Sequence, residues 1–343
     1  MTVLFQPYFG MTSALAVGNA WFNGCTMSLH RLIVYRMLWR RCDASTTQKG
    51  EAVNQYDHLI GKELVSGDWC WDSDRALLYA VGVGAGLEDP LQELQFTTEN
   101  TPGIPQQVIP TFTTLMGLPS NWAELLGWRR EGLSPVGMVH GEQSVTLAGP
   151  LPVSGKAHLS TILRGVYDKG SGALVVKETR ITDANSGAYL ASSWMSLFAQ
   201  GKGGFGGPRG PVGEPRWSRP DGRPDAIISL PIGLNQSLIY RLSGDRHPHG
   251  TEPARARADG FERPIFYGLG TFGVACRALL KALCGGDAAQ FGHMAGRFSK
   301  PVHPGDRLDT LIWRTEEGAL FQTLANGERL VLDRGVFRFS AVR

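Results

Sequence analysis

The sequence predicts an α+β protein made of two copies of one β-rich unit, and three observations lead to this class. The stretch LPVSGKAHLSTILR at 151–164 resembles KPVHPGDRLDTLIWR at 300–314, and Gly-Ala-Leu follows each, at 172–174 and 318–320. Alternating, strand-like stretches surround one long apolar helix pattern. A segment rich in Gly, Pro and Arg, at 201–223, separates the two copies.

These observations divide the chain into four parts. We expect a poorly ordered extension at 1–55, a first β-rich unit at 56–205, a linker at 206–226 and a second unit at 227–343. The first 55 residues hold five basic and two acidic residues, which account for the whole net charge of +3. Their arginines come late, unlike a secretory signal. A transit peptide remains an alternative, but a disordered extension or a start site assigned too early is favoured.

Local patterns predict the main elements in chain order. Residues 72–84 have helical spacing, 96–99 are expected to end a short strand, and 168–172 form a hairpin turn. Two strands are expected within 174–198. In the second copy a strand-like stretch begins at Tyr240, an amphipathic helix covers Gly268–Leu283, and strands cover 308–314, 319–323 and 337–342.

Composition excludes several classes of protein. Residues 56–343 carry no net charge, which argues against a nucleic-acid partner, because such proteins present a basic face. The apolar stretches of the first 55 residues are too short to span a bilayer. Five scattered cysteines (Cys25, Cys42, Cys70, Cys276 and Cys284) show no CxxC pair. They indicate a reducing compartment and small buried side chains rather than a metal site.

The segment 240–273 carries the residues with chemical potential. Asp245 is followed closely by His247 and His249, and an acid with imidazoles on one loop suits proton transfer. Gly268 opens the apolar helix. A glycine N–H at a helix N-terminus suits a developing oxyanion. The segment therefore predicts an acid–base site next to an oxyanion-binding helix end.

This segment resembles the signature of the enoyl-CoA hydratase 2 family, the MaoC-like dehydratases. The signature has roughly the form Y-R-L-S-G-D-x-N-P-L-H-x-D-P, followed by G-F-x-x-P-I-L-H-G-L-C-T-F-G. YRLSGD, Pro248 and GFxxPIxxGLxTFG are retained here. Between residues 59 and 343 the resemblance continues through VGVGAG, IPTF, HGEQ, DKGSG, GGFGG, LNQ and RFSKPVxPG. It implies a double hot-dog fold, in which two antiparallel sheets each wrap around a long helix.

The resemblance implies hydration of trans-2-enoyl-CoA to (3R)-3-hydroxyacyl-CoA, or the reverse dehydration, in fatty or steroid-like acyl-CoA metabolism. The implied catalytic residues are Asp245, His249, His247 and Glu99. No metal or organic cofactor is implied, since CoA is part of the substrate. A homodimer is expected, in the bacterial cytoplasm or in an organelle lumen of a eukaryote, with neither secretion, a membrane span nor nucleic-acid binding.

The resemblance also assigns residues to the substrate. His140 and Gly141 are implied to contact the acyl-CoA, and Lys169 to lie along the CoA, where a cation suits phosphate or pantetheine oxygens. Gly268 is implied to bind the thioester oxygen. Phe298 falls where relatives line the acyl site.

One departure from the signature concerns the catalytic histidine. Aligned without gaps, the family's Asn falls on His247 and its His falls on Gly250. We hypothesise that the free dihedrals of Gly250 absorb a one-residue shift, so that His249 reaches the water that Asp245 holds. His247 would be a secondary donor. The alternatives are a catalytically impaired acyl-CoA-binding subunit and, less favoured because of the SGDxxP loop, a thioesterase.

Overall fold

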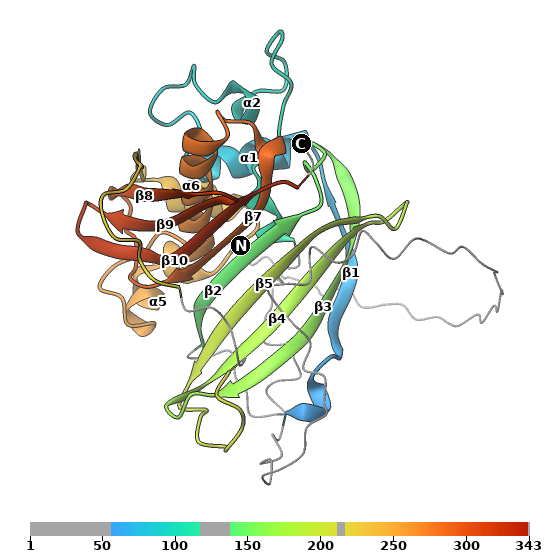
Figure 1. The fold of residues 1–343 in the computed structure, drawn as a ribbon, viewed down its shortest axis with the longest axis vertical. Coiled ribbons are helices and arrows are strands. Elements are labelled where there is room, and N and C mark those ends of the chain that lie inside the picture. Colours follow the sequence, from blue (N-terminus) through green and yellow to red (C-terminus); the bar gives the residue numbers. More distant parts are fainter. Residues whose placement is uncertain (1–55, 117–137, 211–216, 342–343) are drawn as a thin grey trace, which may run out of the picture. The chain divides into compact units, whose positions relative to one another are not determined.

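A computed structural model describes residues 56–116, 138–210 and 217–341 (Figure 1). The expected extension at 1–55 lies outside the described residues. The strands form one ten-stranded sheet in the order β1-β3-β4-β5-β2-β7-β10-β9-β8-β6. Every pair within it is antiparallel. The linker predicted at 206–226 begins after β5, which ends at Gln200, and its last residue, Ala226, is the first residue of β6.

The two halves of this sheet have the same topology. The order 1-3-4-5-2 in the first half is matched by 6-8-9-10-7 in the second, so the repeat at β3–β4 recurs at β8–β9. The fold class is therefore confirmed as a double hot dog, whose two sheets join edge to edge through β2 and β7. The strands are β1 Glu63–Trp71, β2 Met138–Leu147, β3 Gly155–Asp168, β4 Gly172–Asp183, β5 Tyr189–Gln200, β6 Ala226–Pro231, β7 Phe291–Phe298, β8 Arg307–Thr315, β9 Gly318–Ala325 and β10 Arg329–Phe339.

The helical segments are concentrated on the side of the second half-sheet (Figure 1). The longest, α6, covers Gly268–Leu283 as predicted and contacts β6, β7 and β8. The others are η2 Asp57–Leu59, α1 Ser73–Gly82, α2 Leu94–Thr97, η3 Pro110–Leu115, α4 Gln236–Tyr240, η4 Arg241–Ser243, η5 Pro248–Gly250, α5 Pro253–Ala258 and η6 Ala288–Gln290. Helix α1, capped by the Asp72 side chain, packs on α4 and η4. The first copy thus supports the chemistry-bearing segment of the second.

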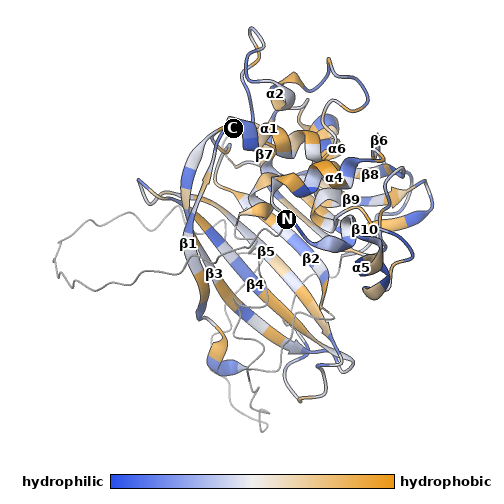
Figure 2. Cartoon of the chain, turned by 180° about the vertical axis from the view of Figure 1, so that it is seen from behind, coloured by the Kyte–Doolittle hydropathy of each residue, from blue (hydrophilic) through white to orange (hydrophobic). Residues whose placement is uncertain are grey.

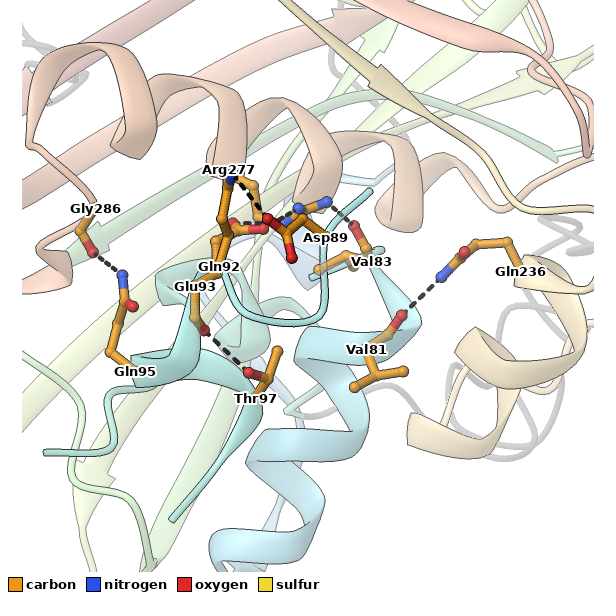
Figure 3. Close-up of polar contacts among 10 residues, drawn as sticks. All are labelled: Val81, Val83, Asp89, Gln92, Glu93, Gln95, Thr97, Gln236, Arg277 and Gly286. Carbon is orange, nitrogen blue, oxygen red and sulfur yellow. Dashed lines mark hydrogen bonds and ion pairs between the residues drawn. The ribbon is translucent and has the colours of Figure 1, made fainter. Parts of the chain in front are cut away.

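Two sequence predictions were wrong about element type. Residues 96–99, expected to end a strand, belong partly to the short helix α2. The stretch around Tyr240, expected to be a strand, is helical in α4 and η4. Gln236 explains the second case, because its side-chain amide donates to the carbonyls of Val81 and Gly82 at the end of α1. Figure 3 shows the bond to Val81. A tertiary contact thus overrides an apolar run that resembles a strand.

The hydrophobic core follows the alternation of the strands. Figure 2 shows hydrophobic and hydrophilic residues alternating along β3 and β4. One large cluster of buried residues spans both halves and includes Val145 of β2 and Met294 of β7, which are paired across the junction. A smaller cluster, with Leu163, Val175 and Leu197, lies in the first half. None of the described helices is long and apolar enough to cross a membrane.

Candidate active site

The loop after η4 presents Asp245 as a half-buried carboxylate. Gly244, just before it, has φ of 134°, a conformation that only glycine adopts readily. The His247 backbone N–H donates to Asp245 Oδ1 over 3.4 Å. Burial nevertheless raises the pKa of Asp245 to about 6. A carboxylate with a pKa this close to neutrality can both take and return a proton.

The imidazole of His249 lies near a different carboxylate. Its Nδ1 is 4.0 Å from Asp259 Oδ2, and its ring centroid is 4.1 Å from that of His247. Burial, and then His247, lower the pKa of His249 to about 4, so the ring is neutral at pH 7. Among the described residues, His249 and Asp245 share no hydrogen bond or ion pair. The structure places both on one loop without joining their side chains.

Gly250 does not have the role that the sequence indicated. It lies in the helical turn η5, whose dihedrals any residue adopts, so it is no left-handed hinge. Its glycine is explained by close approach. A Cβ there would lie 2.5 Å from Cε2 and 2.6 Å from Cζ of Tyr267. The position admits only glycine while the Tyr267 ring stays in place.

Two buried tyrosines flank this loop, and the sequence analysis did not select either as functional. The Tyr267 hydroxyl donates to the His247 carbonyl over 2.8 Å, and its ring lies 5.2 Å from that of Tyr240. Burial and, after it, the negative charge of Asp245 raise the pKa of Tyr267 to about 12. Burial and neighbouring groups, Asp245 among them, raise the pKa of Tyr240 as well. One signal was available, since Tyr267 stands where the signature has a histidine.

A second group of residues gathers at the N-terminus of α6. The ring of Phe298, at the end of β7, lies 4.7 Å from the ring of His140 on β2. A Cβ on Gly268 would be 3.5 Å from the same Phe298 ring. Gly141 sits at an irregularity in the pairing of β2 with β5. The structure therefore brings together four of the expected substrate-binding residues. One of them, Gly268, directly follows Tyr267 in the chain.

The electrostatics of this group suit a thioester. Burial, and then Lys177, lower the pKa of His140 to about 3, so its ring is neutral at pH 7. Gly268 begins α6 after Tyr267, which provides no side-chain cap. The first N–H groups of a helix lack partners inside the helix and carry partial positive charge. Gly268 can therefore donate to a developing oxyanion.

Glu99 and Lys169 lie apart from Asp245. Glu99 is exposed beyond α2, beside a pocket of about 320 Å³ lined by Val81, Ala85, Gly86, Pro90, Thr97 and Thr98. Lys169 is half-buried in the turn between β3 and β4, where its Nζ donates to the Arg209 carbonyl. The strand register places this turn and His140 at the same end of the first half-sheet. Neither Glu99 nor Lys169 contacts Asp245 among the described residues.

A buried ion pair fixes α6 against the segment that leads to Glu99 (Figure 3). Arg277 of α6 donates through Nε to Glu93 Oε1 over 3.1 Å, and a second bond joins the same two groups. Its Nη1 also donates to the Val83 carbonyl over 2.9 Å. Gln95 adds a bond to the Gly286 carbonyl over 3.1 Å. The helix carrying Gly268 is thus tied to the first copy by charge as well as by packing.

One group of described residues has the donor types of a metal site. Ligand atoms of His247, His249 and Asp259 lie within 4.8 Å of one another. Arg255 already pairs with Asp259, its Nε 3.0 Å from Oδ2. Asp245 is not a member of this cluster.

Comparison with known proteins identifies the family. The family model described as "MFE-2 hydratase 2 N-terminal domain" matches residues 69–201, and the model described as "MaoC like domain" matches residues 217–333. The chain belongs to the hydratase 2 family of MaoC-like dehydratases. This membership is based on domain matches over both halves and on relatives that are matched over most of their length.

Two mycobacterial relatives and one solved structure are similar over most of their lengths. The 3-hydroxyacyl-thioester dehydratase Y of Mycobacterium tuberculosis is 44% identical, over 79% of this chain and 93% of the relative. The enoyl-CoA hydratase ChsH3 of the same organism is 37% identical, over 75% of this chain and 88% of the relative. The crystal structure of a MaoC-like dehydratase from Phytophthora capsici has a TM-score of 0.73 at 30% identity. The match covers 84% of this chain and 99% of that structure.

Proposed function

We propose that this protein hydrates trans-2-enoyl-CoA to (3R)-3-hydroxyacyl-CoA, and catalyses the reverse dehydration, in fatty or steroid-like acyl-CoA metabolism. The observation that carries the proposal is Asp245, a half-buried carboxylate with its pKa raised to about 6, on the loop that precedes α6. The names of the two mycobacterial relatives, an enoyl-CoA hydratase and a 3-hydroxyacyl-thioester dehydratase, support it.

The residues divide the reaction between them. Asp245 takes a proton from water while the water oxygen bonds to C3 of the substrate. The electron pair of the C2–C3 double bond moves towards the thioester oxygen, which the Gly268 N–H stabilises. Protonated Asp245 then returns its proton to C2. His249, with its neutral ring, remains a proposed participant, provided that it turns from Asp259 towards the same water.

The other proposals concern substrate binding, assembly and location. We propose that His140, Gly141 and Phe298 line the path of the acyl-thioester, that Glu99 shapes the site from the first copy, and that CoA enters only as part of the substrate. The protein is proposed to act as a homodimer, in the bacterial cytoplasm or an organelle lumen, where acyl-CoA is found.

The direct test uses purified protein with crotonyl-CoA and a longer trans-2-enoyl-CoA. We expect loss of the enoyl-thioester absorbance and formation of the (3R)-hydroxy product, identified by chiral chromatography. Binding of both thioesters without turnover would instead support the alternative, an acyl-CoA-binding subunit, because the family's histidine position is Gly250. Release of free CoA thiol would support the thioesterase.

Lys169 provides a test of the CoA path. Lys169→Glu places a negative charge beside the substrate phosphates, so we expect KM for enoyl-CoA to rise about tenfold while kcat is kept. The effect should vanish with an enoyl-pantetheine thioester, which lacks the nucleotide. Lys281→Glu, an exposed lysine near the far end of α6 from Gly268, is the matched control. Equal KM changes in the two variants would contradict the assignment.

A further inference from the structure

Gly250 and Tyr267 depend on each other. A side chain at Gly250 would point into the Tyr267 ring, since its Cβ would meet Cε2, Cζ and the hydroxyl oxygen at 2.5, 2.6 and 2.9 Å. Both positions carry histidine in the family signature. The Tyr267 ring therefore fills the space that a side chain at position 250 would occupy. The change to Gly250 is matched within the site by the change to Tyr267.

The hydrogen bonds of Tyr267 determine what it can offer. A phenol has one hydrogen, and Tyr267 donates it to the His247 carbonyl over 2.8 Å. Burial and the charge of Asp245 raise the pKa of the phenol, so that hydrogen stays on the oxygen at neutral pH. The lone pairs of the oxygen can only accept, and the Arg241 and Thr251 side chains lie near enough to lower the pKa of the phenol by hydrogen bonding. The bond to His247 holds the phenol oxygen in place as an acceptor.

The surrounding segment leaves polar atoms without partners. Tyr240 is fully buried, and its hydroxyl makes no hydrogen bond within the described residues. The same holds for Arg241 Nε and Ser243 Oγ, in the same short segment. Buried polar atoms ordinarily have partners. Unpartnered groups beside Asp245 and Tyr267 indicate a place built for a polar ligand such as water.

We propose that Tyr267 is the hydrogen-bond acceptor that orients the attacking water for Asp245, in place of an imidazole. This inference rests on the proposed hydration. One hydrogen of the water goes to the Asp245 carboxylate, and the other points to the Tyr267 oxygen. A lone pair of the water oxygen then faces C3 of the substrate and forms the new bond. The second hydrogen stays on the product hydroxyl, so Tyr267 gains and loses no proton.

The test compares variants of two tyrosines, Tyr267 and Tyr79, in the full-length protein. Tyr267→Phe keeps the ring over Gly250 and removes both the acceptor and the bond to the His247 carbonyl, so we expect kcat to fall about ten- to a hundredfold with KM nearly unchanged. Tyr267→His supplies a ring nitrogen that can accept, and should recover part of kcat. Tyr79→Phe is the matched control. It removes a buried hydroxyl bonded to Thr111 over 2.9 Å, and should lower the melting temperature while keeping kcat.

The outcomes separate this inference from its rival and from the proposed function. Wild-type kcat in Tyr267→Phe, or a histidine variant no better than phenylalanine, would overturn it. A large loss in His249→Ala with little loss in Tyr267→Phe would give the role to His249. Absence of hydration in the wild-type protein would instead refute the proposed function, before any variant is compared.

Discussion

Asp245→Asn is expected to reduce kcat for enoyl-CoA hydration by about a hundred- to ten-thousandfold, because it removes the group that takes the proton from water. The substitution keeps the shape of the side chain and its contact with the His247 N–H. Initial rates of absorbance loss with crotonyl-CoA measure the effect. Asp259→Asn is the matched control, since Asp259 is a carboxylate near the same loop, paired with Arg255. A similar loss in both variants would show that the loop, rather than Asp245, was damaged.

Stability distinguishes this loss from unfolding. Because burial raises the pKa of Asp245 to about 6, its charged form is disfavoured in the folded protein at pH 7. Its contribution to stability is thus present at low pH and is lost as the pH rises through about 6. A neutral Asn avoids this penalty, so the variant should melt no lower than wild type at pH 7. A lower melting temperature would remove the basis for assigning Asp245 by this variant.

The same carboxylate predicts the pH profile. Only ionised Asp245 accepts a proton, so kcat/KM should fall tenfold for each pH unit below about 6 and level off above it. The residual activity of Asp245→Asn should lack this limb. His249 has its pKa at about 4, so an acidic limb centred there would favour its imidazole instead.

Glu93→Ala is expected to lower the free energy of unfolding by about 3–5 kcal/mol, because it leaves a buried guanidinium unpaired. The Arg277 side chain is only 2% exposed, and Glu93 is its carboxylate partner. Urea unfolding followed by fluorescence measures the change. Arg277 lies on the helix that begins at Gly268, so loss of the ion pair should also change the position of the Gly268 N–H.

The control is a double replacement. Arg277→Met combined with Glu93→Leu removes both charges and leaves apolar side chains of similar size, and such exchanges are often close to neutral. We therefore expect the double variant to be more stable than Glu93→Ala alone. A double variant as unstable as the single one would mean that packing around Arg277, rather than the unpaired charge, accounts for the loss.

How far the sequence predicted the fold depended on the length and regularity of each pattern. Helix α6 was predicted with its observed bounds because its apolar face repeats over four turns. The internal repeat predicted the equivalence of β3–β4 and β8–β9. Short elements such as α2 and α4 were misassigned, because four or five residues show no decisive period and contacts from distant segments, such as Gln236 to Val81, decide them.

The site was only partly predictable for a similar reason. Asp245, His140 and Gly268 belong to sequence motifs, and the grouping of His140 and Gly268 with Phe298 follows from the fold. The importance of Tyr267 depends on its approach to Gly250 across seventeen positions of sequence, and a one-dimensional pattern does not show which ring fills which space. The pKa of Asp245 likewise comes from burial, which no spacing of residues displays.

The pairing of β2 with β7 joins the two copies of the duplicated unit through a continuous sheet rather than a hinge. His140 stands on one side of this ladder and Phe298 on the other, and their rings meet across it. Where two domains meet through a loose interface, closure must bring cofactor or carrier and chemistry together in each turnover. Here main-chain hydrogen bonds between β2 and β7 join the half with His140 to the half with Phe298, so the alignment of the two halves is set once, when the protein folds.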